Sequence, residues 1–453
     1  MSENERLLAN EAPAFSKAAR VKYFNIVIES GKGATVTDAD GKTYIDLLAS
    51  ASATNTGHSH PHVVKAVQDQ AAKLLQYTPA YFANDNAAKL APRLTALAPI
   101  SGPTALGWGN SGSDANDAII KFARAYTGRP YIVSFTGAYH GSTYGSISVS
   151  SVSLNMSRKI GPLLPDVVKV PFPDPWKRLK GESEADFVDR MFAAFKLPFE
   201  TYLPAEEVAV ILIEPIQGDG GIVKTPDAYM HKVYDFAKAN GILFAVDEVN
   251  QGMGRTGKWW SIEHFGLEPD LMSVGKSLAS GLPLSAVIGR QDIMNSLGAP
   301  ANVYTTAGNP VTAAAAMATI DVIEDEHLLE RSTRLGKKAA DFFAAEKKKF
   351  KFIGDVRMYG LDGGIDIVDP VTGEPDADAT TKIIYRVFEL GAIIISLKTN
   401  VLRFQPPLVI TDEQLQSAFD ILDQPSANFQ RASFHCLITL MKLAGRASDT
   451  QII

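Results

Sequence analysis

The most constraining feature of the chain is a series of short apolar runs that alternate with segments of helical periodicity. Residues 131–135, 208–213 and 242–246 have the length and composition of strands that are buried on both faces. Residues 227–241 place their apolar side chains on one helical face and end in Asn-Gly, which stops a helix. This alternation predicts an α/β domain built around a mainly parallel sheet.

Acidic residues follow two of these predicted strands. Glu214 follows the run 208–213, and Asp247 and Glu248 follow the run 242–246. Ligands of parallel α/β sheets bind beyond the carboxyl ends of the strands, so we expect a ligand site at this edge. A buried carboxylate at position 247 needs a partner. A protonated pyridine nitrogen would supply one, and so would backbone amides or Arg255.

The character of the chain changes near residue 320. Residues 328–349 are typical of a charged, alanine-rich surface helix, and shorter strand-like runs such as 391–396 follow it. A turn at residues 38–41 is typical of a hairpin. We expect an N-terminal segment that belongs to a small domain, a large ligand-binding domain and a C-terminal small α+β domain, over residues 1–60, 61–320 and 321–453.

Composition and charge narrow the classes of partner. The 453 residues carry a net charge of −6, which argues against nucleic acid or an anionic membrane surface. No apolar run approaches the roughly 20 residues of a membrane span, and the polar start does not resemble a signal peptide. The one cysteine, Cys436, excludes an intrachain disulfide and a cysteine-based zinc site. These features predict a cytoplasmic protein, although the apolar stretch from Pro425 to Ile453 is unusual for a tail.

Lys276 lies in a stretch of small and apolar residues and has no carboxylate within five residues on either side. Small neighbours allow a flat ligand to approach closely, and partial desolvation favours the neutral, nucleophilic amine. This combination suits a lysine that forms a Schiff base with a carbonyl cofactor. A surface lysine in a Gly/Ser loop is the alternative, since lysines are rarely buried without a partner.

Two turns rich in hydroxyl groups suit a phosphate group. Residues 110–125 begin as a Gly/Ser turn and continue as a helix, so backbone N–H groups and the hydroxyls of Ser111 and Ser113 would face an anion. Residues 305–310 form a second such turn, which includes Thr305. Simple capping of the following helix explains the first turn equally well, and for the second turn, taken alone, it is the favoured interpretation.

A late arginine and three histidines complete the candidates. Arg403 is a lone cation in an apolar run, where its planar guanidinium would bind a substrate carboxylate or pair with a glutamate. His58, His60 and His62 resemble a metal cluster. Alternate residues followed by proline do not form a facial three-histidine site, so we predict no metal.

Together, these candidates are the parts of a pyridoxal phosphate (PLP) site. The parts are the phosphate turn, the acid at a strand end, the lone lysine, the second turn and the arginine. Six stretches resemble the class III aminotransferase family, in register over roughly residues 20–423. They are residues 110–116, 137–141, 214–218, 247–257, 275–278 and 305–310. Residues 111–128, 214–222 and 274–281 more narrowly resemble the amino-acid racemases of that family.

The resemblance implies the fold type I architecture of PLP enzymes, in which a large domain with a mainly parallel seven-stranded sheet is joined by a smaller α+β domain. It implies that Lys276 carries PLP and that Asp247 pairs with the pyridine nitrogen. It also implies an active site shared between subunits, hence a homodimer or homotetramer. The further cofactor contacts that it implies are Ser111, Gly112 and Ser113 at the phosphate, Tyr139 and Val249 on the ring faces, Asn250 near the phenolic oxygen, and Thr305 from the other subunit.

Asp219 distinguishes the possible reactions. Many aminotransferases of the family have a glutamate here, which pairs with the arginine corresponding to Arg403. The shorter aspartate leaves that arginine to the α-carboxylate and, by the resemblance to the racemases, acts as a catalytic base together with Lys276. We expect a racemase or epimerase of nonpolar, branched-chain α-amino acids such as isoleucine, because racemisation needs acid/base groups on both faces of Cα. An aminotransferase with a 2-oxoacid acceptor and an inactive PLP-binding scaffold are the alternatives.

Overall fold

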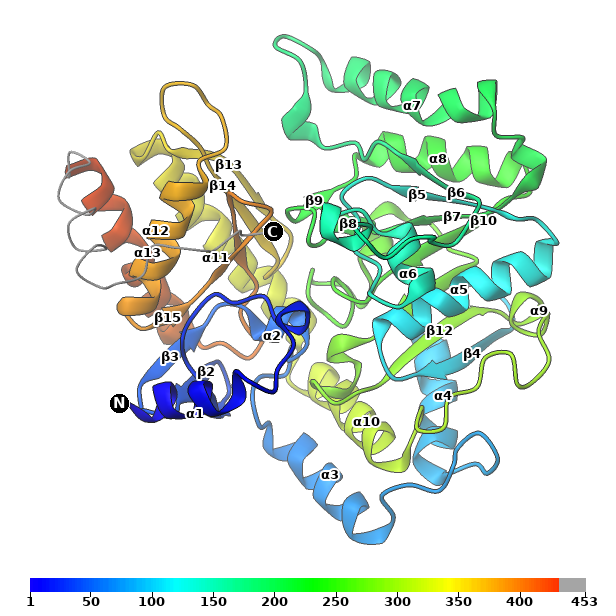
Figure 1. Cartoon of the computed structure of the whole chain (residues 1–453), viewed down its shortest axis with the longest axis horizontal. Helices are drawn as coiled ribbons and strands as arrows, with labels where there is room; N and C mark the ends of the chain where they lie inside the picture. Colours follow the sequence, from blue (N-terminus) through cyan, green and yellow to red (C-terminus); the bar gives the residue numbers. More distant parts are fainter. Residues whose placement is uncertain (432–453) are drawn as a thin grey trace. The chain divides into compact units, whose positions relative to one another are not determined.

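The computed structural model describes residues 1–431, with side chains described through residue 424. Cys436 and most of the apolar tail therefore lie outside the described residues. The chain divides into two compact units (Figure 1). The larger unit comprises residues 50–56 and 61–333, and the smaller one comprises residues 1–49, 57–60 and, among the described residues, 334–431. The domain bounds expected near residues 60 and 320 stay a prediction.

A seven-stranded sheet forms the centre of the larger unit. Its order is β4-β12-β11-β10-β7-β5-β6. Strand β12 pairs antiparallel with both of its neighbours, whereas the other pairs are parallel. This confirms the predicted mainly parallel sheet. The strands are β4 Thr104–Gly109, β5 Tyr131–Phe135, β6 Val167–Val170, β7 Val208–Ile213, β10 Leu243–Asp247, β11 Leu271–Val274 and β12 Ser285–Arg290.

Helices bury both faces of this sheet. Every residue of β7 and β10 is buried, which matches their composition of Val, Ile, Leu, Phe and Ala up to the terminal Asp247 of β10. Each Val, Ile, Leu or Phe side chain among them contributes about 1.5–3 kcal/mol on burial. Helix α5, seen beside the strands in Figure 1, contributes Ile119 and Phe122 to an apolar cluster that also includes Leu212 of β7 and Ala245 of β10. The helices within this unit are α3 Pro61–Lys73, α4 Asp85–Leu97, α5 Gly112–Thr127, α6 Tyr144–Val149, α7 Glu184–Thr201, α8 Asp227–Ala239, α9 Gln291–Met294 and α10 Pro310–Asp325.

The smaller unit contains two four-stranded sheets with helices, as expected for an α+β unit. One sheet has the order β1-β2-β3-β15 and the other β13-β14-β17-β16. The run 391–396 is divided between the two sheets, because β15 ends at Ile393 and β16 begins at Ile395. The strands are β1 Ile28–Lys32, β2 Thr35–Asp38, β3 Thr43–Asp46, β13 Ile353–Met358, β14 Gly363–Ile367, β15 Ala392–Ile393, β16 Ile395–Leu397 and β17 Val401–Phe404. Helices α1, α12 and α13 span Glu3–Glu11, Ala377–Glu389 and Asp412–Arg431.

Two helices contain residues of both units. They are α2 Ala49–Ser52 and α11 Leu328–Lys349, and the latter has the bounds predicted for the surface helix. The hairpin turn predicted at residues 38–41 connects the antiparallel strands β2 and β3. A short hairpin of β8 Ile216–Gln217 and β9 Val223–Lys224 follows β7. Within residues 1–431, no helix has both the length and the apolar character needed to cross a membrane.

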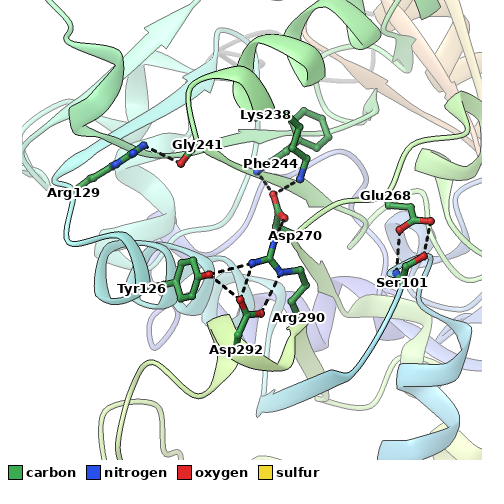
Figure 2. A network of polar contacts seen from close by, with 10 residues as sticks. All are labelled: Ser101, Tyr126, Arg129, Lys238, Gly241, Phe244, Glu268, Asp270, Arg290 and Asp292. Carbon is green, nitrogen blue, oxygen red and sulfur yellow. Dashed lines mark hydrogen bonds and ion pairs between the residues drawn. The ribbon is translucent and has the colours of Figure 1, made fainter.

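A buried carboxylate joins three elements at the amino-terminal end of the sheet. Asp270 directly precedes β11 and accepts hydrogen bonds from the backbone N–H of Phe244, from Lys238 Nζ and from Arg290 Nη1, at 2.8, 2.8 and 2.9 Å. Figure 2 shows these three donors around the carboxylate. The network lies at the opposite end of β11 from Lys276, so it is a structural feature.

We predict that Asp270→Ala lowers the free energy of unfolding by about 2–4 kcal/mol, because it leaves a buried N–H without an acceptor and two cations without their counter-charge. Urea unfolding measures the loss. The matched control is Asp292→Ala, whose half-exposed carboxylate also binds Arg290 and whose loss costs less than about 1 kcal/mol. Equal losses in the two variants would contradict the role given to Asp270.

Candidate active site

A cavity of about 160 Å³ lies beyond the carboxyl ends of β7, β10 and β11. By this measure a cavity needs only about 10–15 Å³ to hold one water molecule, so this one has room for a larger ligand. Among the predicted site residues, those lining it are Gly112, Ser113, Tyr139, Asp219, Asp247, Val249, Asn250 and Lys276. The cavity is also lined by Asn116, His140, Gly141 and Glu214.

The first predicted phosphate turn is the amino terminus of α5. Ser111 caps this helix, since its hydroxyl accepts a hydrogen bond from Asp114 N, and it is not among the lining residues. Gly112 and Ser113 begin the helix and line the cavity, so the helix presents its N–H groups and the positive end of its dipole there. A Cβ on Gly112 would lie 2.7 Å from Val249 Cγ1, which explains the glycine.

Asp247 is the last residue of β10 and is only 4% exposed. Its Oδ2 accepts hydrogen bonds from Asn116 Nδ2 at 2.7 Å and from His140 Nδ1 at 2.8 Å, and its Oδ1 accepts one from Val249 N at 3.0 Å. These donors stabilise a carboxylate that also faces the cavity. Such a group suits a protonated ring nitrogen of a ligand.

Asn116 and His140 were not predicted as site residues, although both lie in recognised motif stretches. Asn116 comes one turn after Gly112 on α5, and His140 follows the predicted ring-stacking residue Tyr139. A polar residue inside an otherwise apolar helical face is the signal that identifies Asn116. The contacts with Asp247 connect residues more than 100 positions apart, so no local pattern predicts them.

Glu214 and Asp219 add two carboxyl groups to the cavity. Glu214 follows β7 and accepts hydrogen bonds from Gly218 N at 3.2 Å and Tyr139 N at 3.4 Å. Burial and the neighbouring carboxylates of Asp247 and Asp219 hold the pKa of the Glu214 carboxyl well above its ordinary value. Asp219 lies in the β8–β9 turn and is half-buried. The raised pKa favours the neutral form of the Glu214 carboxyl.

We predict that Glu214→Gln becomes progressively more stable relative to the native chain as the pH rises. Between the ordinary pKa of an unfolded glutamate and the raised pKa in the folded state, the folded state binds more protons, so the native chain loses stability with increasing pH. The slope approaches about 1.4 kcal/mol per pH unit for one proton. Urea unfolding at several pH values from 5 to 8 tests this, and a difference between the chains that is independent of pH contradicts it.

Lys276 directly follows the buried stretch at the end of β11. It is half-buried, lines the cavity and adopts a φ of 45°, a left-handed conformation that costs a non-glycine residue about 1–2 kcal/mol. Ser277 holds this turn, since its Oγ donates to Ser52 O and accepts from Asn55 N, each at 2.9 Å. Strain of this kind is concentrated at functional sites.

Thr305 and Arg403 are not among the residues that line the cavity. Thr305 is exposed in the larger unit, and its carbonyl accepts a hydrogen bond from Gln76 Nε2 at 2.7 Å. Asn309, and not Thr305, caps the helix α10 that follows. Arg403 lies on β17 in the smaller unit.

Two residues of the histidine motif lie beside aspartates. His58 Nε2 lies 2.7 Å from Asp46 Oδ2, and His62 Nε2 lies 3.3 Å from Asp321 Oδ2. In the part of the chain that the structure describes, no group of three His, Cys, Asp or Glu residues is arranged to hold a metal ion.

The cavity fits PLP. An amine, a carboxylate held by two donors and a helix amino terminus match the aldehyde, ring nitrogen and phosphate of this cofactor. Small residues keep the phosphate turn open, since a Cβ on Gly141 would lie 2.3 Å from Ser113 Oγ. The half-buried Tyr139 and Val249 supply the flat and apolar surfaces that a ring needs.

Comparison with known proteins places these features in a family. Residues 16–425 match the model of the class-III aminotransferases. The chain is 58% identical to isoleucine 2-epimerase from Lentilactobacillus buchneri, over 93% of this chain and 94% of that protein. It is 41% identical to a leucine/methionine racemase from Thermococcus litoralis, over 94% and 96%. The solved structure of an amine transaminase from an uncultivated Pseudomonas species, in a PLP-bound form, is similar with a TM-score of 0.84 at 26% identity, over 92% of this chain and 98% of that one.

Proposed function

Because the chain belongs to the class-III aminotransferase family, we propose that it is a PLP-dependent racemase or epimerase of nonpolar α-amino acids, with branched-chain substrates such as isoleucine. The observation that carries this proposal is that Lys276 and Asp219 line one cavity. Two acid/base groups at one site suffice for racemisation, in which one removes the Cα proton and the other returns it. The names of the two racemising relatives support the choice of substrate.

Pyridoxal phosphate is the cofactor of this chain. When bound, it supplies an electron-accepting ring that stabilises negative charge at the substrate Cα. We assign Asp247, held by Asn116 and His140, to the ring nitrogen. In the same proposal, Tyr139 and Val249 contact the ring faces, Asn250 lies near the phenolic oxygen, and Gly112 and Ser113 bind the phosphate.

Lys276 and Asp219 carry out the proton transfers. A general acid/base group typically contributes about 10²–10⁴-fold to a rate, so each of the two is essential for turnover. The raised pKa of the Glu214 carboxyl favours its neutral form, which limits the negative charge beside Asp219.

We assign Arg403 to the substrate α-carboxylate. The side chain is 3% exposed and lies within β17. A planar guanidinium binds a carboxylate through two parallel hydrogen bonds, which orients as well as attracts it. The racemase reaction needs no second substrate, so this arginine has one kind of carboxylate to recognise.

We predict that Asp247→Asn weakens binding of PLP about 10–100-fold, because a charge-assisted hydrogen bond to the ring nitrogen is lost. Fluorescence titration of the cofactor-free protein with PLP measures the dissociation constant. Asp227→Asn, at the exposed start of α8, is the control. Unchanged affinity in Asp247→Asn would argue against the assignment.

The test of the reaction is incubation with L-isoleucine in D2O without any 2-oxoacid. A racemase inverts Cα and incorporates deuterium there, which chiral chromatography and mass spectrometry detect. Activity that appears only after a 2-oxoacid is added would instead identify an aminotransferase. Cofactor absorbance without either activity would identify a PLP-binding scaffold.

A second copy of the chain is the proposed partner. Within the larger unit, the segment 74–82 exposes five large apolar side chains, from 42% to 79% of their surface: Leu74, Leu75, Tyr77, Tyr81 and Phe82. Exposed apolar clusters of this kind mark interfaces. The same segment bonds to the Thr305 carbonyl through Gln76, so a copy covering it would bring Thr305 to an interface.

Sedimentation analysis of the full chain tests this assembly. We expect a dimer or tetramer, and we expect Tyr81→Glu combined with Phe82→Glu to give a monomer with weakened PLP retention. A native chain that sediments as a monomer would overturn the proposed partner while leaving the proposed reaction open to its own test.

A further inference from the structure

Three buried polar side chains form a line in the smaller unit. Asp362 and Gln405 have no exposed surface, and Arg403 is 3% exposed. Strands β14 and β17 pair antiparallel, with Gly363 opposite Phe404. The residue before β14 and the residue after β17 are therefore neighbours, which brings Asp362 to Gln405.

The hydrogen bonds along this line run in one direction. Arg403 Nε donates a hydrogen bond to Gln405 Oε1, and Gln405 Nε2 donates one to Asp362 Oδ1. A carboxylate accepts only, so Asp362 determines which end of the Gln405 amide points toward it. The amide oxygen is then turned to the guanidinium, and the plane of Arg403 is fixed at its Nε.

The line also supplies a counter-charge. A guanidinium enclosed among apolar side chains is costly unless a negative charge and hydrogen bonds compensate it. Arg403 itself is buried, and Gln405, two positions further along the chain, is buried as well. Asp362 provides a negative charge within the same unit, and the amide of Gln405 connects it to the guanidinium.

We propose that Gln405 and Asp362 are positioning residues that fix the guanidinium plane of Arg403 for recognition of the substrate α-carboxylate. The proposal rests on the role given to Arg403 in the proposed function. Bidentate recognition of a carboxylate depends on the orientation of the guanidinium plane, so a rotated arginine keeps its charge but loses much of its selectivity.

The experiment compares two ligands of the PLP-loaded enzyme that differ only in the carboxylate. L-Leucine and 3-methylbutylamine are titrated separately, and the change in cofactor absorbance gives the two dissociation constants. In Gln405→Leu, we expect the dissociation constant for L-leucine to rise about ten-fold, as for a lost hydrogen bond to a charged group, with that for the amine unchanged. KM for L-leucine rises in parallel, and kcat falls less.

Two further variants test the line itself. The quantity compared is the ratio of the dissociation constant for L-leucine to that for the amine. Asp362→Ala should raise this ratio less than Gln405→Leu does, because the amide keeps its contact with Arg403. Gln405→Glu combined with Asp362→Asn exchanges donor and acceptor while keeping the total charge, and we expect it to restore the ratio to within about three-fold of the native value. Failure of this pair to recover any selectivity overturns the proposed line.

Controls separate a structural effect from a failed assignment. Asp366→Asn, on β14 and bonded to Asn400 and Arg357, removes another buried carboxylate of the same unit and should leave the ratio unchanged. Arg403→Gln should remove the preference for L-leucine altogether. An Arg403→Gln variant with native selectivity contradicts the proposed function of Arg403. If Arg403→Gln loses its selectivity for L-leucine but Gln405→Leu keeps it, only the positioning role is contradicted.

Discussion

Lys276→Ala is expected to lower the rate of Cα proton exchange on L-isoleucine by at least about 10³-fold. The lysine has two tasks in the proposed reaction, since it binds the cofactor covalently and exchanges the Cα proton. Among the residues that the structure describes, no other lysine lines the cavity. Deuterium incorporation at Cα, followed by mass spectrometry, measures the rate.

The covalent bond gives a second readout that is independent of turnover. Borohydride reduction should leave PLP attached to the native chain at the peptide containing Lys276 and should label nothing in Lys276→Ala. Lys258→Ala, which replaces an exposed lysine in the glycine-rich loop after β10, should retain both label and activity. Full proton exchange in Lys276→Ala, or the label on another peptide, would refute the role of Lys276.

Asp219→Asn is expected to suppress racemisation by about 10²–10⁴-fold while bound PLP stays largely intact. The amide keeps the size of the side chain but cannot accept a proton from Cα. With one base left, Lys276 should still exchange the Cα proton of one enantiomer with solvent and return it on the same face. We therefore expect deuterium incorporation with retained configuration for one of the two enantiomers.

This split between exchange and inversion distinguishes a two-base site from a one-base site. Chiral chromatography of each enantiomer after incubation in D2O, together with the deuterium content, reports both. Asp227→Asn serves as the control for the substitution, since its carboxylate lies on α8 outside the cavity. Inversion at the native rate in Asp219→Asn, or loss of the cofactor absorbance, would show that Asp219 has another role.

The seven-stranded sheet and many of the site residues follow from local sequence patterns. The fully apolar runs at 208–213 and 242–246 predict β7 and β10, because buried parallel strands need apolar side chains on both faces. The observed strand β10 begins and ends one residue later than the predicted run, so Asp247 is its last residue and does not follow it. A glycine and serine turn before a helix likewise predicts, from local sequence alone, that Gly112 and Ser113 contact the phosphate.

Helix capping shows where local patterns stop being sufficient. Ser111 and Ser113 are two positions apart in one turn, yet the first caps α5 and only the second lines the cavity. In the second turn, Asn309 is the cap and Thr305 is exposed. The choice depends on backbone direction at the helix start, which the mere presence of hydroxyl groups does not reveal.

The sequence by itself determined the class of sheet, the cofactor lysine as a candidate and the family to which the chain belongs. Only the tertiary structure decided which carboxyl has a raised pKa and which residues hold Asp247 and Arg403. Glu214 is affected by Asp247 across the β7–β10 pair, and Asn116 reaches Asp247 from 131 positions away. A pKa and a buried hydrogen bond depend on distance and burial, which strand order and register set and which local periodicity does not encode.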